Sequence, residues 1–170
     1  MTPPVLETER LVLRRLTVAD DAFILELLND PAWLEFIGDK GVRTLDDARE
    51  YIRNGPMAMY DRMGFGLFLT KRKIDGIPAG LCGLIKRDTL EDVDIGFAFL
   101  PAFRATGYAF EAASAVLALG KSTFGLKRIV AITSPSNERS VLLLERLGMT
   151  FEKMVKLSAD DEVQLYVSAS

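Results

Sequence analysis

The residues with the clearest capacity for chemistry are Arg104-Ala105-Thr106-Gly107-Tyr108-Ala109, a short turn between two apolar segments. The segment before it ends at Pro101 and the alanine-rich segment after it carries Glu111, so we expect a strand, a turn and then a helix. A helix N-terminus presents unpaired backbone N–H groups and a partial positive charge. With the arginine beside them, these groups would suit an anion, and a pyrophosphate is the obvious candidate. An ordinary strand-to-helix turn with a solvated arginine would show the same residues.

This turn differs from both common phosphate-binding motifs. No Gly-Lys-Ser/Thr lies near it, and Gly107 is its only glycine, so neither the P-loop nor the Gly-x-Gly-x-x-Gly pattern fits. A nucleotide-phosphate binder of another kind remains a possible class. It is disfavoured because neither a phosphate-binding lysine nor a metal-binding acid lies beside the turn.

The segment before the turn, residues 94–100, alternates in a way that leaves one face nearly bare. By the period of a strand, Asp94, Gly96 and Ala98 share one face, and the large apolar residues share the other. Two very small residues beside an acid leave an open strip along the strand. Either a slender ligand or a closely packed helix would fit that strip.

Hydrophobic periodicity predicts how these segments are held in place. We expect strands at residues 7–16, 65–69, 79–86, 93–100, 127–133, 149–157 and 163–167. We expect helices from Thr17 or Asp20 to residue 28, and at 44–52, 107–124 and 137–147. The prediction is a single domain over residues 1–170 of the α/β (α+β) class, with a mixed seven-stranded sheet flanked by about four helices.

Composition excludes several functional classes. The chain has 170 residues, 49% of them apolar, and a net charge of −3, so it has no basic field for nucleic acid. No segment approaches the roughly 20 apolar residues that span a bilayer, and residues 1–4 lack a signal-peptide profile. Histidine is absent and Cys82 is the only cysteine, which excludes histidine triads and disulfide frameworks. We expect a cytoplasmic monomer or homodimer without a metal, a nucleic-acid partner or a membrane partner.

Three runs of residues together resemble the GNAT-type N-acetyltransferases. Residues 94–112 look like the central motif of that family, and residues 136–149 look like its second motif, Asn-x-x-Ser followed by Glu-x-x-Gly-Phe. Residues 7–14, Glu-Thr-Glu-Arg-Leu-Val-Leu-Arg, resemble the first strand of the subgroup that contains the ribosomal-protein N-terminal (alanine) acetyltransferases. The runs occur in the family's order and spacing and cover almost the whole chain.

The resemblance implies a mostly antiparallel sheet, splayed open beside the 94–100 strand, with acetyl-CoA in the cleft. An exposed strand edge can add the amide chain of pantetheine like another strand. Asn137 would bond the pantetheine, although it would serve equally as a plain helix N-cap. Backbone groups of Phe97, Ala98 and Phe99 would hold the thioester and the pantetheine arm, and those of Arg104, Ala105, Thr106, Gly107, Tyr108 and Ala109 would cradle the pyrophosphate.

The sequence departs from the family pattern at two positions. Ala105 stands where a first glycine is common, and a methyl group there would tighten the phosphate loop or weaken CoA binding. Leu144 stands where many members have a tyrosine, the acid that protonates the leaving thiolate. Ser140, from Asn-x-x-Ser, is the nearest substitute, although a serine one turn into a helix is often only structural.

The implied reaction is direct attack of a neutral amine on the thioester in a ternary complex, with backbone N–H groups stabilising the oxyanion. Asp94 would accept the proton of the amine, directly or through a water, unless it is simply a polar residue of the strand. The expected function is therefore transfer of acetyl from acetyl-CoA to a primary amine, either a protein N-terminus or a small molecule. The alternative is a weak or inactive CoA-binding regulatory protein with the same fold, which Ala105 and Leu144 would favour.

Overall fold

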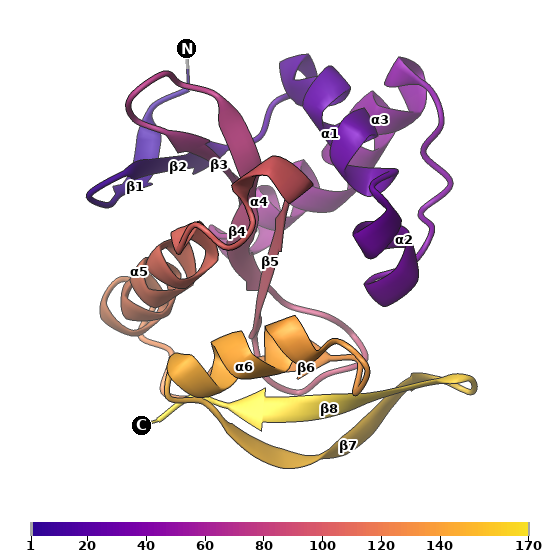
Figure 1. The fold of residues 1–170 in the computed structure, drawn as a ribbon, viewed down its shortest axis with the longest axis vertical. Helices are drawn as coiled ribbons and strands as arrows, with labels where there is room; N and C mark the ends of the chain where they lie inside the picture. The colour runs from indigo at the N-terminus through magenta and orange to yellow at the C-terminus, as the bar shows by residue number, and fades with distance from the viewer. Residues whose placement is uncertain (1, 170) are drawn as a thin grey trace.

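A computed structural model describes residues 2–169 (Figure 1). These residues contain eight strands in one sheet, in the order β1-β2-β3-β4-β5-β6-β8-β7, and six α-helices. The strands are β1 (Pro4–Glu7), β2 (Leu11–Arg15), β3 (Leu67–Arg72), β4 (Pro78–Ile85), β5 (Asp94–Phe99), β6 (Val130–Thr133), β7 (Thr150–Ser158) and β8 (Asp161–Val167). The helices are α1 (Asp21–Leu28), α2 (Pro31–Phe36), α3 (Leu45–Ile52), α4 (Ala58–Met63), α5 (Tyr108–Ser122) and α6 (Glu138–Arg146).

The mixed, mostly antiparallel sheet is confirmed, but it has one strand more than the seven we predicted. The additional strand, β1, pairs antiparallel with β2 through a register shift between Pro4 and Leu6. It was missed because four residues that begin with a proline carry little periodic signal. Among the described strands only β5 and β6 run parallel; the other neighbouring pairs are antiparallel.

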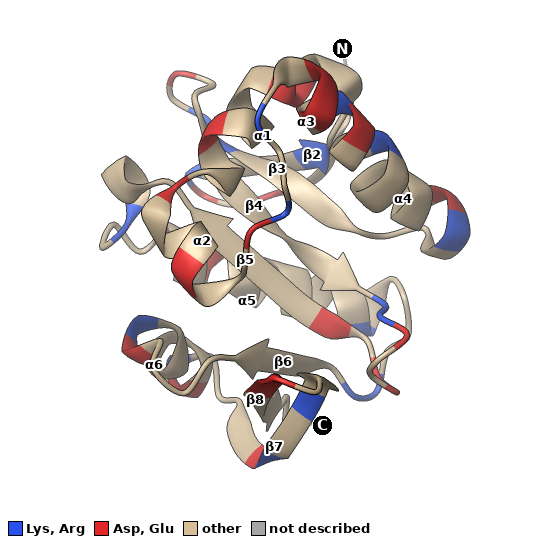
Figure 2. Cartoon of the chain, turned by 90° about the vertical axis from the view of Figure 1, so that its right-hand side faces the viewer, with Lys and Arg blue, Asp and Glu red and all other residues tan. Residues whose placement is uncertain are grey.

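The helices form two layers on opposite faces of the sheet, and each layer encloses its own core. Neighbouring residues of β3 show the division, because side chains alternate between the faces of a strand. Phe68 is buried in the core under α5, together with Ala113, whereas Leu69 is buried in the core under α1 and α3, together with Ile24 and Ile52. A ligand beside β5 therefore meets α5 on one face and α1 to α3 on the other (Figures 1 and 2).

Helix α5 lies close to the sheet because its inner face is built from small side chains. Its buried residues recur at the spacing of one helix face, and two neighbouring alanines lie at its N-terminal half. The buried residues are Ala112, Ala113, Val116, Leu117 and Gly120. The close packing fixes the N-terminus of α5 at the C-terminal end of β5. No helix within residues 2–169 is long and apolar enough to cross a bilayer.

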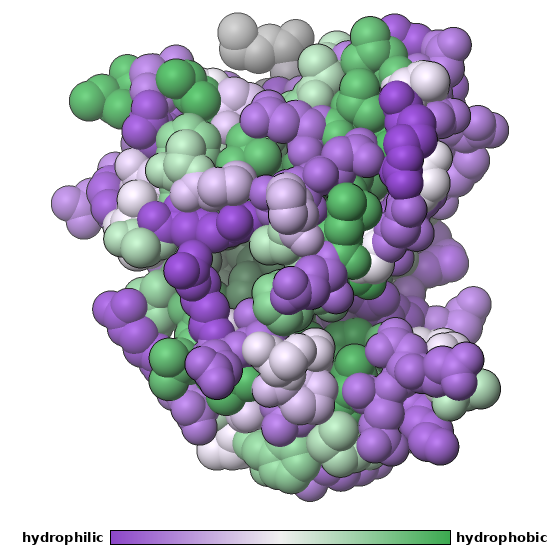
Figure 3. All heavy atoms as spheres, turned by 45° about the vertical axis from the view of Figure 1, so that its right-hand side comes forward, coloured by the Kyte–Doolittle hydropathy of each residue, from purple (hydrophilic) through white to green (hydrophobic). Residues whose placement is uncertain are grey.

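The sheet is splayed between β5 and β6, as the fold prediction required. The two strands share a single bridge, Asp94 with Val130, where the N–H of Val130 donates to the carbonyl of Val93 at 3.0 Å. Beyond this bridge no residue of β5 pairs with β6 in the described chain. Figure 2 shows β6, β7 and β8 turned away below β5, and in Figure 3 the molecular surface recedes between the two parts.

Candidate active site

The turn that leads from β5 to α5 adopts an unusual backbone conformation. A 3-10 turn, Pro101–Phe103, follows β5, and the chain then enters the left-handed region twice, at Ala105 (φ 60°) and at Gly107 (φ 84°). Glycine tolerates this region freely, whereas an alanine there is strained because its Cβ approaches the neighbouring carbonyl. These two residues bend the chain so that α5 begins at Tyr108.

The bend leaves a row of backbone donors open at the helix N-terminus. The first N–H of this region with a protein acceptor is that of Glu111, which donates to the carbonyl of Gly107 at 3.0 Å. The N–H groups of residues 105–110 have no acceptor within the described chain. The hydroxyl of Thr106 donates back to the carbonyl of Phe103 at 2.7 Å and closes the loop. The turn therefore has the donors and the helix end that an anion requires.

Arg104 lies in this loop but is already engaged with protein atoms. Its N–H donates to the carbonyl of Pro101 at 3.3 Å, and its guanidinium forms an ion pair with Asp30. Asp30 lies just before α2, and its side chain is almost completely buried. Arg104, which the sequence analysis expects to lie beside a bound anion, thus ties the loop to the helices on the other face of the sheet.

The edge of β5 that faces β6 is open over two residues. Leu100 donates to the carbonyl of Ala79 on β4, whereas the carbonyl of Val93 points toward β6. Because backbone groups alternate in direction along a strand, the N–H and C=O groups of Phe97 and Phe99 also point toward β6. They lie beyond the last bridge and have no partner strand, so they form the edge predicted to hold the donor. The backbone groups of Ala98 point toward β4, and its side chain is only a methyl group.

Helix α6 lies across the splay and begins at two predicted site residues. The side-chain oxygen of Asn137 accepts a hydrogen bond from the N–H of Ser140 at 3.3 Å, so Asn137 does cap the helix. The amide nitrogen of Asn137 and the hydroxyl of Ser140 make no side-chain hydrogen bond within the described chain and are free to bind a ligand. Ser140 is half-buried, one turn before Leu144.

Asp94 lies at the point where β5 and β6 separate, and it is buried, with 1% of the residue exposed. Burial raises the pKa of its carboxyl group from 3.8 to about 6, and Arg87 partly opposes this rise. The Nε atom of Arg87 lies 3.1 and 3.3 Å from the two carboxylate oxygens. The carboxyl group is therefore a base suited to pH values above 6, but a proton can reach it only through an intermediate such as a water.

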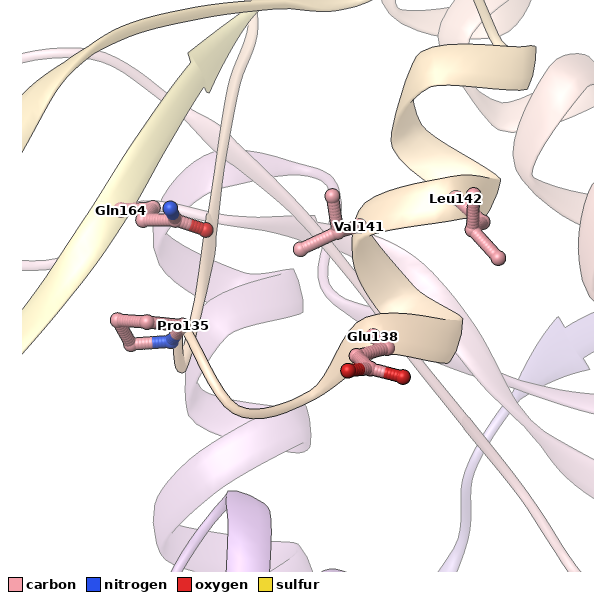
Figure 4. Close-up of a pocket in the computed structure, with 5 residues that line it drawn as sticks. All are labelled: Pro135, Glu138, Val141, Leu142 and Gln164. Carbon is pink, nitrogen blue, oxygen red and sulfur yellow. The ribbon is translucent and has the colours of Figure 1, made fainter.

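Two surface pockets lie away from residues 104–109, which we call the donor loop because they are the predicted binding site for the acetyl donor. One, of about 300 Å³, is lined by the start of α6 and by β8; the side chains of Val141 and Gln164 point into it (Figure 4). The other, of about 410 Å³, lies between residues 40–42 and α3, and Tyr51 contributes to its wall. The donor features instead lie along an open strand edge and a loop. No cluster of three metal-ligating side chains is present within residues 2–169.

Comparison with known proteins gives the family. Residues 10–150 match the acetyltransferase (GNAT) domain. The chain belongs to the GNAT acetyltransferases. It is 26% identical over 155 residues to the uncharacterised N-acetyltransferase YoaA of Bacillus subtilis, covering 90% of this chain and 86% of YoaA. GNAT acetyltransferases take their acetyl group from acetyl-CoA.

Solved structures of GNAT enzymes share the whole fold. The acetyltransferase from Agrobacterium tumefaciens superimposes with a TM-score of 0.82 at 25% identity, covering 100% of this chain and 96% of that one. The ribosomal L7/L12 alpha-N-protein acetyltransferase RimL, solved with coenzyme A, has a TM-score of 0.82 at 16% identity, with 97% of both chains covered. The second likeness concerns the fold alone. The resemblance seen in the sequence is thereby confirmed for family and fold.

The structure explains both departures from the GNAT pattern. Ala105 has a left-handed backbone, which is the conformation that favours the glycine common at this position. Leu144 is buried, with 1% exposed, in the core under α5 and α6. A leucine at this position packs and has no proton to give.

Sequence reasoning missed two arginines of this region. Arg87 carried no signal, because nothing in the loop before β5 indicates that it folds back on Asp94. Arg10 lies within residues 7–14, which resemble the first strand of the GNAT subgroup, but that resemblance implied no role for Arg10. In the structure the Nη1 atom of Arg10 donates to the carbonyl of Thr106, in the donor loop, at 3.0 Å.

Proposed function

We propose that this acetyltransferase transfers the acetyl group of acetyl-CoA to a primary amine, either a protein N-terminus or a small molecule, by direct attack in a ternary complex. One observation carries the proposal: the open edge of β5 leads directly into the loop whose N–H groups have no protein acceptor. A strand edge suits the amides of pantetheine, and a helix N-terminus suits the pyrophosphate. The two lie in the order in which these groups occur along CoA.

Each predicted donor residue has a part in this arrangement. The N–H and C=O groups of Phe97 and Phe99 pair with pantetheine, and the methyl side chain of Ala98 adds little bulk beside them. The side-chain amide of Asn137 bonds the same arm from across the splay while its oxygen caps α6. Arg104 holds the loop through Asp30, and the N–H groups of Ala105, Thr106, Gly107, Tyr108 and Ala109 bind the pyrophosphate.

When bound, acetyl-CoA supplies a thioester carbonyl for the amine to attack and a thiolate leaving group. The N–H of Phe97, near the apex of the splay, is placed to stabilise negative charge on the carbonyl oxygen. Ser140 offers its hydroxyl proton to the departing thiolate and regains a proton from solvent. Asp94 receives the proton of the amine through a water, because its carboxyl group is buried and no longer faces solvent.

The pKa of Asp94 bears on the class of acceptor. An α-amine has a pKa of about 8, so roughly a tenth of it is neutral at pH 7, whereas the amine of a lysine, with a pKa of about 10.4, is neutral in well under about 1% of molecules. A base with a pKa of about 6 is adequate for the first and weak for the second. This favours α-amines and amines of similarly low pKa as acceptors.

The test is a calorimetric titration of the purified protein with acetyl-CoA and, separately, with ATP, followed by a screen of amines for acetylation. Micromolar binding of acetyl-CoA, weaker binding of ATP and turnover with an amine are expected. Failure to bind acetyl-CoA would reject the proposal. Binding without turnover on any amine would instead support a CoA-binding regulatory protein, the alternative that the buried Leu144 favours.

A further inference from the structure

The turn between β1 and β2 is held against the start of α5 by a set of hydrogen bonds to Glu111. The hydroxyl of Thr8 and the N–H of Arg10 donate to one carboxylate oxygen, at 2.5 and 2.8 Å. The Nε atom of Arg10 donates to the other oxygen at 2.7 Å. These contacts join residues about a hundred positions apart and tie the β1–β2 turn to the first turn of α5.

The rest of the Arg10 side chain lies on the donor loop itself. Its Nη1 donates to the carbonyl of Thr106 at 3.0 Å, and its guanidinium carbon lies 4.5 Å from the ring centre of Tyr108. A Cβ atom placed on Gly107 would lie 3.2 Å from Nη2. The side chain touches three consecutive loop residues, and 44% of it is exposed.

The Nη2 nitrogen of this guanidinium has no hydrogen-bond partner in the described chain. Its Nε and Nη1 atoms each make one hydrogen bond, to Glu111 and to Thr106. The other arginines near the loop are paired, Arg104 with Asp30 and Arg72 with Asp75. Arg10, itself paired with Glu111, differs from both in that its guanidinium contacts three consecutive loop residues and has an unpartnered Nη2 beside Gly107.

We propose that Arg10 is a donor-binding residue of this enzyme and that its Nη2 binds a phosphate of acetyl-CoA seated on the loop. The proposal rests on the proposed function, since it needs acetyl-CoA at the loop. Guanidinium groups bind phosphates with strong, charge-assisted hydrogen bonds. Glu111 and Thr106 fix the group in advance, so little side-chain entropy is lost on binding. The phosphate is either part of the pyrophosphate or the 3′-phosphate.

The experiment compares the wild type with Arg10→Ala, Arg10→Lys and the control Arg128→Gln. Arg128 is a surface arginine that pairs with Asp92 and Glu152, away from the loop. Affinity for acetyl-CoA is measured by calorimetry, and kcat and KM are measured with an amine acceptor and either acetyl-CoA or S-acetylpantetheine, which lacks every phosphate. Dephospho-CoA, which lacks only the 3′-phosphate, identifies the group that is bound.

We expect Arg10→Ala to raise the Kd and KM for acetyl-CoA about tenfold or more, with kcat within about twofold of wild type. Activity on S-acetylpantetheine should not change, and Arg10→Lys should recover part of the affinity. If dephospho-CoA also binds about tenfold more weakly to the variant, the pyrophosphate is the partner; if it does not, the 3′-phosphate is.

An equal loss with S-acetylpantetheine would overturn the proposal, because it would show that Arg10 only supports the fold. Unchanged affinity for acetyl-CoA in Arg10→Ala would overturn it as well. Should Arg10→Ala fail to fold, the same comparison of the two acetyl donors is made with Arg10→Lys. If the wild type itself does not bind acetyl-CoA, the proposed function fails rather than this assignment alone.

Discussion

The two faces of β5 are built from different parts of the chain. On the α5 side the proposed donor site consists mainly of backbone: open N–H groups at residues 105–110 and the free strand edge at Phe97 and Phe99. On the opposite side the features are side chains, the buried pair of Asp94 with Arg87 and the hollow beside Tyr51. Backbone geometry is common to many sequences, whereas side chains are particular to one. A family can therefore keep one donor while each member changes its acceptor.

The largest effect is expected at Gly107, in the loop that offers open backbone N–H groups. In Gly107→Glu the new side chain carries a negative charge to the loop at a left-handed position, and its Cβ would press on Arg10. We expect calorimetry to show at least about a hundredfold loss of acetyl-CoA affinity from the lost donor geometry and the added repulsion.

The matched control for that variant is Gly76→Glu. Gly76 also has a left-handed backbone, φ 70°, with nothing within 4 Å of a Cβ, and it lies in the β3–β4 turn. This control introduces the same charge and the same backbone strain elsewhere. Equal affinities of the two variants would show that the loop does not hold the pyrophosphate.

The next largest effect is expected at Asp94, on the face of β5 where the features are side chains. Only its ionised form accepts a proton, so that form is lost as the pH falls through about 6. With an α-amine acceptor of pKa about 8, log rate should rise with a slope of about two below pH 6 and about one from 6 to 8. In Asp94→Asn we expect a slope of one throughout and a rate about tenfold to a hundredfold lower. An unchanged steep limb would remove Asp94 from the mechanism.

The raised pKa of Asp94 also affects stability. The rate should rise with pH, whereas the stability that this carboxyl group contributes should fall. Because its folded pKa lies above the ordinary 3.8, the folded protein keeps this proton between about pH 4 and 6 while the unfolded chain has released it. Stability from this group therefore falls as the pH rises through that window. In urea unfolding, the stability of the wild type relative to that of Asp94→Asn should therefore fall across this range, because the other carboxyl groups contribute equally to both proteins.

A smaller effect is expected at Ser140, in the first turn of α6. Ser140→Ala keeps the backbone bond to Asn137 and removes only the hydroxyl. We expect kcat to fall about tenfold, with acetyl-CoA affinity unchanged, because a hydroxyl acid acts on the leaving group and not on binding. Ser136→Ala, in the loop before the helix, serves as the control. A wild-type kcat in Ser140→Ala would assign the residue a structural role.

The smallest effect concerns the strain in the loop. Ala105→Gly relieves a left-handed alanine, which costs about 1–2 kcal/mol, and loses about 0.5–1 kcal/mol to the greater freedom of the unfolded chain. A net gain of about 0.5 kcal/mol in the free energy of unfolding is expected from urea titrations. Ala102→Gly, in the 3-10 turn, should instead lose stability. A loss in both variants would show that Ala105 carries no strain.

Much of the donor side was predictable because its causes are local. The turn at residues 104–109, the strand before it and the helix after it depend on small, left-handed and capping residues within a few positions of one another. The helix predicted from residue 44 likewise begins with a local device, a capping box formed by Thr44 and Asp47. Strand β1 escaped prediction because it is short and gains its stability from pairing with β2.

The sequence by itself determined the family, the mostly antiparallel sheet and the strand–turn–helix that we propose binds an anion, since these follow from periodicity and short motifs. Only the tertiary structure decided which charges meet: Arg104 with Asp30, Arg10 with Glu111, and Arg87 with Asp94. Local propensity reaches a few residues along the chain, whereas an ion pair requires two groups within about 4 Å in space. The packing of β1, α2 and α5 around the loop creates that proximity, and with it a free arginine donor beside Gly107.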